Sequence, residues 1–284
     1  MTEPNSRLKA LLSLIDMSLE NQRSILIELN SLLADCTQDL FDLGIKFENA
    51  GLLEKLLIQI IKHNLSIATL SKGSYIKIRE NELMMDDLTA VYSIARLQIE
   101  TFVNLSYLFF LEFEISQELR ISIYKIQGLN QQISLTSKHS KKFEPVAKMR
   151  NELAEELKKL RNLSEFKLAS KKEKTKYTKP RYARLKKPDE IYDMIKIGDL
   201  SKTHSLYSNH IHSEYISIRQ LNSAIQNTEQ ISNSISTVII LCSRITSLVI
   251  TNFTSKYEIE NNSFSKKSDI LGEKIDALNK MYGK

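Results

Sequence analysis

Histidines are concentrated in one short segment, 203–215 (THSLYSNHIHSEY), which holds three of the chain's five. Gly198 and Asp199 just upstream indicate a helix start, so the segment is predicted to be helical. At about 100° per residue, a helix gathers imidazole, phenol and hydroxyl groups on one face. The members of that face are His204, Tyr207, Ser208, Ile211, His212 and Tyr215. His210 is expected to point nearly the opposite way.

Two interpretations of this face stay open. His204 and His212 are either polar packing residues of a core or groups that exchange protons near neutral pH, as general acid–base chemistry requires. Zinc binding is disfavoured because H-x-H diverges on a helix and the helical H-E-x-x-H pattern is absent. Neither a metal nor a cofactor is expected.

A second pair that could do chemistry lies at four-residue spacing in an apolar stretch. Arg96 and Glu100 share one helix face, with Asn104 one turn further on. Charges in such a stretch are costly unless they are paired or face a polar cavity. The pair is either a structural ion pair or an arginine held by Glu100 and directed at a phosphate, which guanidinium geometry suits.

The third feature is a basic segment interleaved with tyrosines. Residues 138–187 carry 18 Lys or Arg against 6 Asp or Glu, a local net charge of +12, whereas the whole chain carries +6. Such asymmetry favours a polyanion partner, RNA above all, with counterion release supplying affinity. A solvated charged loop is the alternative. The candidate nucleic-acid contacts are Lys171, Lys172, Lys174, Lys176, Tyr177, Lys179, Arg181, Tyr182, Arg184, Lys186 and Lys187.

The elements that must position these groups are predicted to be helices. The chain of 284 residues has only 7 Gly and 4 Pro, and its apolar residues recur mostly at three- and four-residue steps. An all-α bundle with a long central helix and N-terminal amphipathic helices is expected, and a sheet is not. The expected helices cover 7–33, 36–48, 52–70, 82–118, 117–127, 144–170, 188–196, 199–213, 216–253 and 268–281. Residues 171–189 are expected to form a loop.

Three parts are expected: an N-terminal helical extension (1–50), a main bundle (51–255) and a C-terminal helix (256–284). The N-terminal helices are the expected site for a partner protein or a second copy. The longest uncharged run, 230–243, is too short to cross a bilayer, so no membrane span is expected. Cys36 and Cys242 are expected to be buried and free. A cytoplasmic protein is the resulting expectation.

Two short motifs carry a family resemblance. Arg96-x-x-x-Glu100 followed by Tyr207-Ser208-x-x-Ile211-His212 resembles a family of prokaryotic all-helical domains of unknown function, over about residues 55–250. More distantly, the helical build and the Arg/His pairing are similar to HEPN domains, which include metal-independent ribonucleases of toxin–antitoxin and antiphage systems. The HEPN pattern R-x(4–6)-H itself does not occur in this chain.

This resemblance implies a helical protein that cleaves or binds RNA, typically as a dimer. In the catalytic version His212 is the acid–base group, and Arg96, oriented by Glu100, stabilises charge on the phosphorus. Tyr207 or Ser208 would position the phosphate, with His204 nearby. The competing hypothesis is a non-catalytic helical interaction protein whose histidine face is structural.

Overall fold

The protein is described by a computed structural model, and it is helical, as expected. The structure describes residues 12–13, 16–42, 44, 47–137, 144–195, 197–211, 214–215, 218–219, 228–257 and 269–280. These residues fold into two compact units. Unit 1 comprises Met1–Leu105 and Ile195–Lys284, and unit 2 comprises Ser106–Met194.

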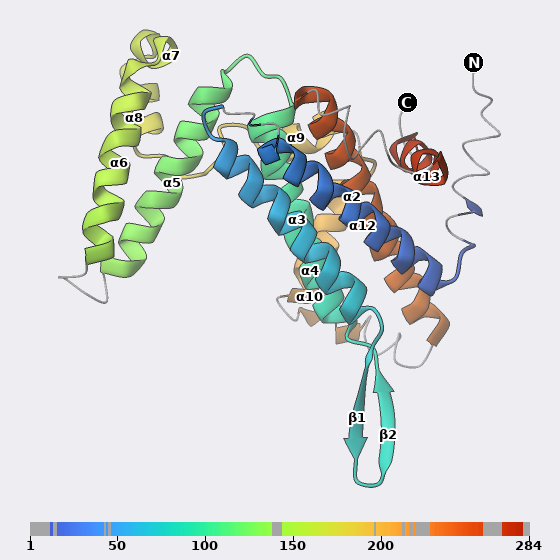
Figure 1. Ribbon diagram of the computed structural model, residues 1–284. Helices are drawn as coiled ribbons and strands as arrows, with labels where there is room; N and C mark the ends of the chain where they lie inside the picture. The colour runs from blue at the N-terminus through green and yellow to red at the C-terminus, as the bar shows by residue number, and fades with distance from the viewer. Residues whose placement is uncertain are drawn as a thin grey trace. The chain divides into compact units, whose positions relative to one another are not determined.

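Unit 1 is a helical bundle (Figure 1). Its helices are α2 (Leu19–Asp42), α3 (Ala50–Leu70), α4 (Leu88–Leu105), α10 (Leu200–Ile211), α12 (Thr228–Tyr257) and α13 (Asp269–Lys280). Helix α2 packs on α3 and α12, α4 packs on α3, α10 and α12, and α13 packs on α12. Helices α2 and α13, from the expected terminal parts, therefore contact the expected main bundle directly.

The core of unit 1 follows from the apolar spacing of its helices. Leu26, Leu29 and Leu33 of α2 recur at three- and four-residue steps and are fully buried, as are Leu53, Leu57 and Ile60 of α3. Cys36 and Cys242 are buried and free, which confirms the expectation for both.

A layer of neutral polar side chains crosses this core. Asn64 of α3 donates to Asn30 Oδ1 of α2 at 3.0 Å and to Thr246 Oγ1 of α12 at 2.9 Å. Gln98 of α4 donates to Asn64 Oδ1 at 2.8 Å. Asn64, Gln98 and Thr246 are fully buried, so these hydrogen bonds replace part of those lost to water, while Gln98 Oε1 has no hydrogen-bond partner among the described residues.

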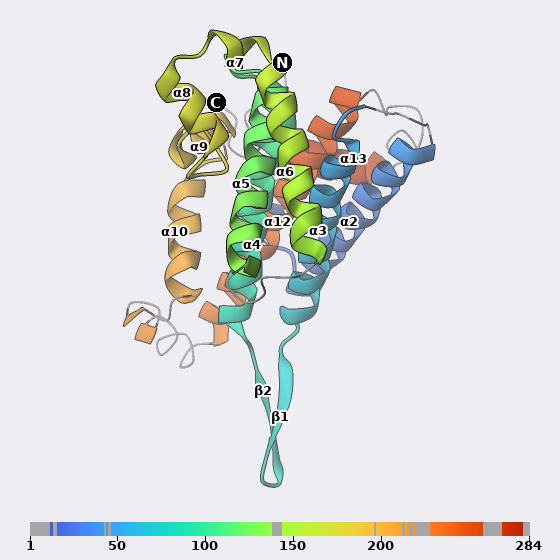
Figure 2. The same ribbon diagram turned by 90° about the vertical axis from the view of Figure 1, so that its left-hand side faces the viewer.

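The expectation of no sheet is wrong, because a β-hairpin joins α3 to α4. Strands β1 (Ser74–Ile78) and β2 (Asn81–Met85) pair antiparallel, and all ten strand residues are exposed. The hairpin extends beyond the ends of α3 and α4 in both views (Figures 1 and 2). The expected helix 82–118 is therefore wrong at both ends, since 81–85 form a strand, α4 ends at Leu105, and residues 111–116 after the π-helical turn Ser106–Phe110 are not helical.

Unit 2 is built on a helical pair and shorter helices. Its elements are the π-helical turn η1 (Ser106–Phe110), α5 (Gln117–Ser137), α6 (Glu144–Asn162), α7 (Ser164–Leu168), α8 (Lys171–Thr178) and most of α9 (Pro188–Ile195). Leu119, Ile123 and Ile126 of α5 pack with Leu160 of α6. Helix α5 runs through Gly128 instead of ending there, and the expected helix 144–170 is divided into α6 and α7.

Helix α12 is the longest helix of the described chain. Glu229–Tyr257 is apolar and long enough to span a membrane by length and composition alone, with a mean hydropathy of 1.7 in its best window. In that window 61% of the helix is buried inside the protein. Packing against α2, α4 and α13 accounts for this apolar composition.

Candidate functional site

Helices α4 and α10 hold the candidate site between them, and both belong to unit 1 (Figure 2). The two helices are antiparallel, since the early His204 meets the late Glu100 while the later Tyr207 and His210 meet the early Tyr92. The Tyr207 ring stacks on Tyr92 with centroids 4.6 Å apart. These contacts fix the rotation of α10 about its own axis.

The predicted direction of His210 is wrong. His210 is 3% exposed, and its ring lies 4.6 Å from that of Tyr92, centroid to centroid, tilted by 59°. The buried positions of α10 are Leu200, Tyr207 and His210, spaced by seven and three residues along one helix face. This face turns inward, so His210 faces α4 together with Tyr207.

The polar contact of the site joins Glu100 to His204. His204 Nε2 lies 2.9 Å from Glu100 Oε1, and Arg96 Nη2 lies 3.9 Å from the same oxygen. The side chains of His204, Arg96 and Glu100 are 19%, 25% and 34% exposed. Partial burial strengthens the electrostatic interactions among the three side chains, and their remaining exposure lets a dissolved molecule reach them.

The Arg96 guanidinium is held loosely by the part of the chain that the structure describes. Its 3.9 Å approach to Glu100 exceeds hydrogen-bond length, and its buried Nε has no hydrogen-bond partner there. Guanidinium groups present five donors in a planar fork that matches the oxygens of a phosphate. Arg96 can therefore accept an anion without first breaking a strong ion pair.

The contact with Glu100 determines which ring nitrogen of His204 carries the proton. A carboxylate only accepts hydrogen bonds, so Nε2 of His204 must carry the proton that it donates to Oε1. A neutral His204 then has its lone pair on Nδ1, and Glu100 stabilises the imidazolium once Nδ1 takes a proton. A carboxylate-oriented histidine beside an arginine is a suitable arrangement for proton transfer next to a phosphate.

The remaining predicted catalytic residues are placed as follows. Tyr207 is 2% exposed, and its burial raises the pKa of its hydroxyl, as burial also does for the Tyr92 hydroxyl and the Cys242 thiol. Ser208 is half-buried on α10. His212 lies outside the described residues, so its meeting with Arg96 stays a prediction.

The basic segment lies in unit 2, and the expectation of a loop over 171–189 is wrong for its first half. Residues Lys171–Thr178 form helix α8, which begins with a capping box: Ser170 N donates to Glu173 Oε2 at 2.9 Å, and Glu173 N donates to Ser170 Oγ. The Ser170 hydroxyl also donates to Glu173 and lowers the pKa of that carboxyl. Segment 171–189 contains seven lysines and no regular apolar spacing, so its sequence did not indicate this helix.

The side chains of this segment differ in how far they reach solvent. Tyr177 packs against Phe166, Lys174 donates to the Lys167 carbonyl, and Lys186 pairs with Glu190 at 3.4 Å. Arg184 is half-buried. The exposed members are Lys171, Lys172, Lys176, Lys179, Arg181, Tyr182 and Lys187. These seven form the part of the predicted contact surface that a nucleic acid can reach.

Within the ranges that the structure describes, no three His, Cys, Asp or Glu residues gather in a group that could hold a metal ion. No known protein family, curated protein or solved structure matches the chain. The resemblance to the prokaryotic helical family and to HEPN domains therefore remains a prediction.

Sequence reasoning found Arg96, Glu100 and His204 but did not pair Glu100 with His204. The two residues are 104 positions apart, and no local pattern links them. One signal was missed: Tyr92, Arg96 and Glu100 recur at four-residue steps and so form a continuous stripe on α4. That stripe is the surface on which α10 lies.

Proposed function

We propose that this protein binds RNA and cleaves it without a metal ion, with Arg96, Glu100 and His204 as the reacting site. The observation that carries the proposal is the 2.9 Å contact of His204 Nε2 with Glu100 Oε1, next to the loosely held Arg96 guanidinium. Acid, base and anion-binding groups thus come together on a partly exposed surface.

The proposed chemistry uses the 2′-hydroxyl of RNA as the nucleophile. His204 Nδ1 takes the proton of that hydroxyl while its oxygen forms a bond to phosphorus and the bond to the 5′-oxygen breaks. Glu100 stabilises the imidazolium, and Arg96 binds the non-bridging oxygens as their charge grows. The leaving 5′-oxygen takes a proton from the imidazolium or from water, which yields a 2′,3′-cyclic phosphate and a 5′-hydroxyl.

Tyr207 has a supporting role in this proposal. Its buried ring, stacked on Tyr92, holds α10 against α4 and so keeps His204 beside Glu100. The exposed cations of unit 2 supply the affinity for the RNA backbone. Ser208 keeps its predicted role of positioning the phosphate, and His204 takes the acid–base role that the sequence analysis assigned to His212.

The test is cleavage of an RNA oligonucleotide in EDTA by the purified protein. The wild type is expected to give 2′,3′-cyclic phosphate ends, and an oligonucleotide with only 2′-deoxyribose is expected to stay intact. His204→Gln is expected to lower the rate by about 100-fold or more, since general acid–base groups contribute that much. His63→Gln, which changes a histidine of α3, is the matched control and should cleave like the wild type.

Absence of cleavage by the wild type, or equal cleavage by His204→Gln, overturns the catalytic proposal. The second candidate function is then a non-catalytic interaction protein. The observation that favours it is the ring packing of Tyr92, Tyr207 and His210, which by itself gives α10 a structural reason to carry aromatic and imidazole groups. RNA binding without cleavage would be recognised by a salt-sensitive complex that His204→Gln leaves unchanged.

A further inference from the structure

The β-hairpin between α3 and α4 has two unlike faces. The register pairs Ser74 with Met85, Ile76 with Leu83 and Ile78 with Asn81, so these six side chains share one face. We call them the uncharged face, because none carries a charge and four are large and apolar. Tyr75 opposite Met84 and Lys77 opposite Glu82 form the other face.

The uncharged face has no cover within the described chain. Its apolar members Ile76, Ile78, Leu83 and Met85 are 45%, 51%, 51% and 50% exposed. A lone two-stranded hairpin is only marginally stable in water, and contiguous apolar surface of this kind marks an interaction site. The hairpin is therefore a candidate interaction surface.

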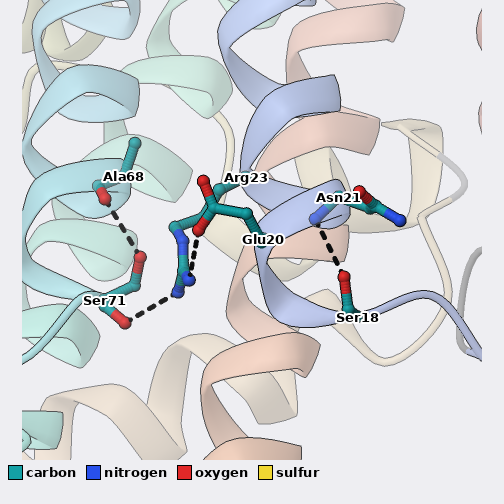
Figure 3. A network of polar contacts seen from close by, with 6 residues as sticks. All are labelled: Ser18, Glu20, Asn21, Arg23, Ala68 and Ser71. Atoms are coloured by element: carbon teal, nitrogen blue, oxygen red, sulfur yellow. Dashed lines mark hydrogen bonds and ion pairs between the residues drawn. The ribbon is translucent and has the colours of Figure 1, made fainter.

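The base of the hairpin is held firmly by the bundle. Arg23 of α2 donates to the Ser71 carbonyl at 3.0 Å and pairs with Glu20 at 2.8 Å, while Ser71 Oγ donates to the Ala68 carbonyl (Figure 3). This network fixes the end of α3 at Ser71, three residues before the strand begins at Ser74.

Gly73 on the α3 side and Asp87 on the α4 side add further constraints at the base of the hairpin. Gly73 has a φ of +70°, and a Cβ there would lie 2.9 Å from both Asp86 Oδ1 and Met84 Cε. Asp87 Oδ1 accepts from the Ala90 amide at 2.9 Å and so caps the start of α4. A projection fixed at both ends loses little conformational entropy when it binds.

The balanced charges of the hairpin disfavour polyanions and anionic lipids as its partners. Lys77 lies opposite Glu82, and Arg79 is followed by Glu80 in the connecting turn, so the positive and negative charges cancel. Affinity for RNA or an anionic membrane requires clustered Lys and Arg. The uncharged face instead suits another uncharged apolar surface.

We propose that two copies of this chain associate through the uncharged faces of their hairpins, packed face to face about a two-fold axis. An apolar face without charges is self-complementary, since each copy offers what the other needs and no charge pattern must be matched. Lys77, Glu82 and Tyr75 stay on the outer sides in contact with water. This interface lies apart from the N-terminal helices expected from the sequence.

The size of the face sets the strength of the dimer. Five-residue strands are about 17 Å long and lie about 5 Å apart. Such a face is far smaller than the roughly 800 Å² per partner of stable complexes. The dimer therefore dissociates on dilution, and it has to be measured over a range of concentrations.

The test is sedimentation velocity of the full chain at increasing concentration, with two variants of adjacent residues on opposite faces. Leu83→Lys places a charge on the uncharged face and is expected to give monomers throughout. Met84→Lys makes the same kind of change at a side chain that is 47% exposed on the other face, and it should dimerise like the wild type. Circular dichroism shows that both variants keep the helical fold.

A second measurement uses introduced cysteines, since Cys36 and Cys242 are buried. Leu83→Cys should cross-link into dimers under mild oxidation, and Met84→Cys should not. A wild type that stays monomeric at every concentration overturns the proposal, as does a dimer that Leu83→Lys leaves intact. Binding of a monomeric wild type to vesicles of neutral phospholipid would assign the face to a membrane instead.

Discussion

Helix α4 carries two groups of polar side chains that differ in charge and in exposure. Gln98 is fully buried and belongs to the neutral layer that Asn30, Asn64 and Thr246 complete. Arg96 and Glu100, each two residues away, are charged and partly exposed, and Glu100 Oε1 contacts His204 while Arg96 lies 3.9 Å from the same oxygen. The two groups share a helix and differ in charge, in exposure and in the length of the contacts that Asn64 Nδ2, Gln98 Nε2 and Arg96 Nη2 make with their acceptors.

This difference separates a structural role from a chemical one. In the neutral layer Asn64 Nδ2 and Gln98 Nε2 lie within 3.0 Å of their side-chain acceptors on neighbouring helices, so the layer helps to fix how α2, α3, α4 and α12 pack. In the charged group Arg96 Nη2 stays 3.9 Å from the only carboxylate that it approaches among the described residues. A loosely paired guanidinium contributes little to folding and is available to a ligand.

The largest expected effect comes from removing the centre of the neutral layer. Asn64→Ala removes one buried hydrogen bond from each of Asn30, Gln98 and Thr246, on α2, α4 and α12. Each abandoned buried group costs about 1–3 kcal/mol, so we expect a loss of about 3 kcal/mol in the free energy of unfolding. Urea denaturation measures it.

The control is Asn21→Ala, which removes an exposed asparagine side chain from α2 of the same unit. It should change the free energy of unfolding by less than about 0.5 kcal/mol, as surface substitutions do. Equal free energies of unfolding for the two variants would show that the neutral layer does not stabilise the fold, which would contradict its structural role.

A smaller effect is expected on RNA affinity. Lys172→Ala with Lys176→Ala removes two exposed cations of α8, which should lower the slope of log affinity against log salt by about 2. Filter binding at several salt concentrations measures this slope. Lys55→Ala with Lys62→Ala, two exposed lysines of α3, is the control, and a similar loss there would mean that binding follows net charge alone.

The smallest expected effect concerns His63 of α3. Burial lowers the pKa of His63 from its ordinary value of 6.5. As pH falls below that value, the unfolded chain takes up a proton that the folded chain refuses, so His63 makes stability fall with falling pH. His63→Gln should weaken this decline in denaturation curves recorded between about pH 8 and pH 5. A difference between the two proteins that is constant with pH would contradict the assignment.

Much of the bundle could be predicted from the sequence, because apolar spacing of three and four residues encodes buried helix faces directly. Helices α3, α10 and α13 begin and end within about two residues of the expected positions. Cys36 and Cys242 were expected to be buried because they are far apart in the sequence and have no metal-type ligands beside them, and both are buried. These are local properties.

What could not be predicted depends on contacts distant in sequence or on unusual local geometry. The hairpin turn lacks the usual Asn-Gly or Asp-Gly signal, and Arg79 occupies its positive-φ position at 58°. The direction of His210 depends on how α10 packs on Tyr92, 118 residues earlier in the chain. The pairing of Glu100 with His204 follows from the same packing.

The comparison on α4 is tested most directly by two variants, two residues apart, each assayed for both unfolding free energy and RNA cleavage in EDTA. Arg96→Gln is expected to lower the cleavage rate by about 100-fold or more, as loss of a transition-state donor does, and to change stability by less than about 1 kcal/mol. Gln98→Leu is expected to cost about 1–3 kcal/mol of stability and to cleave at the wild-type rate while folded. An Arg96→Gln variant that cleaves like the wild type would contradict the account.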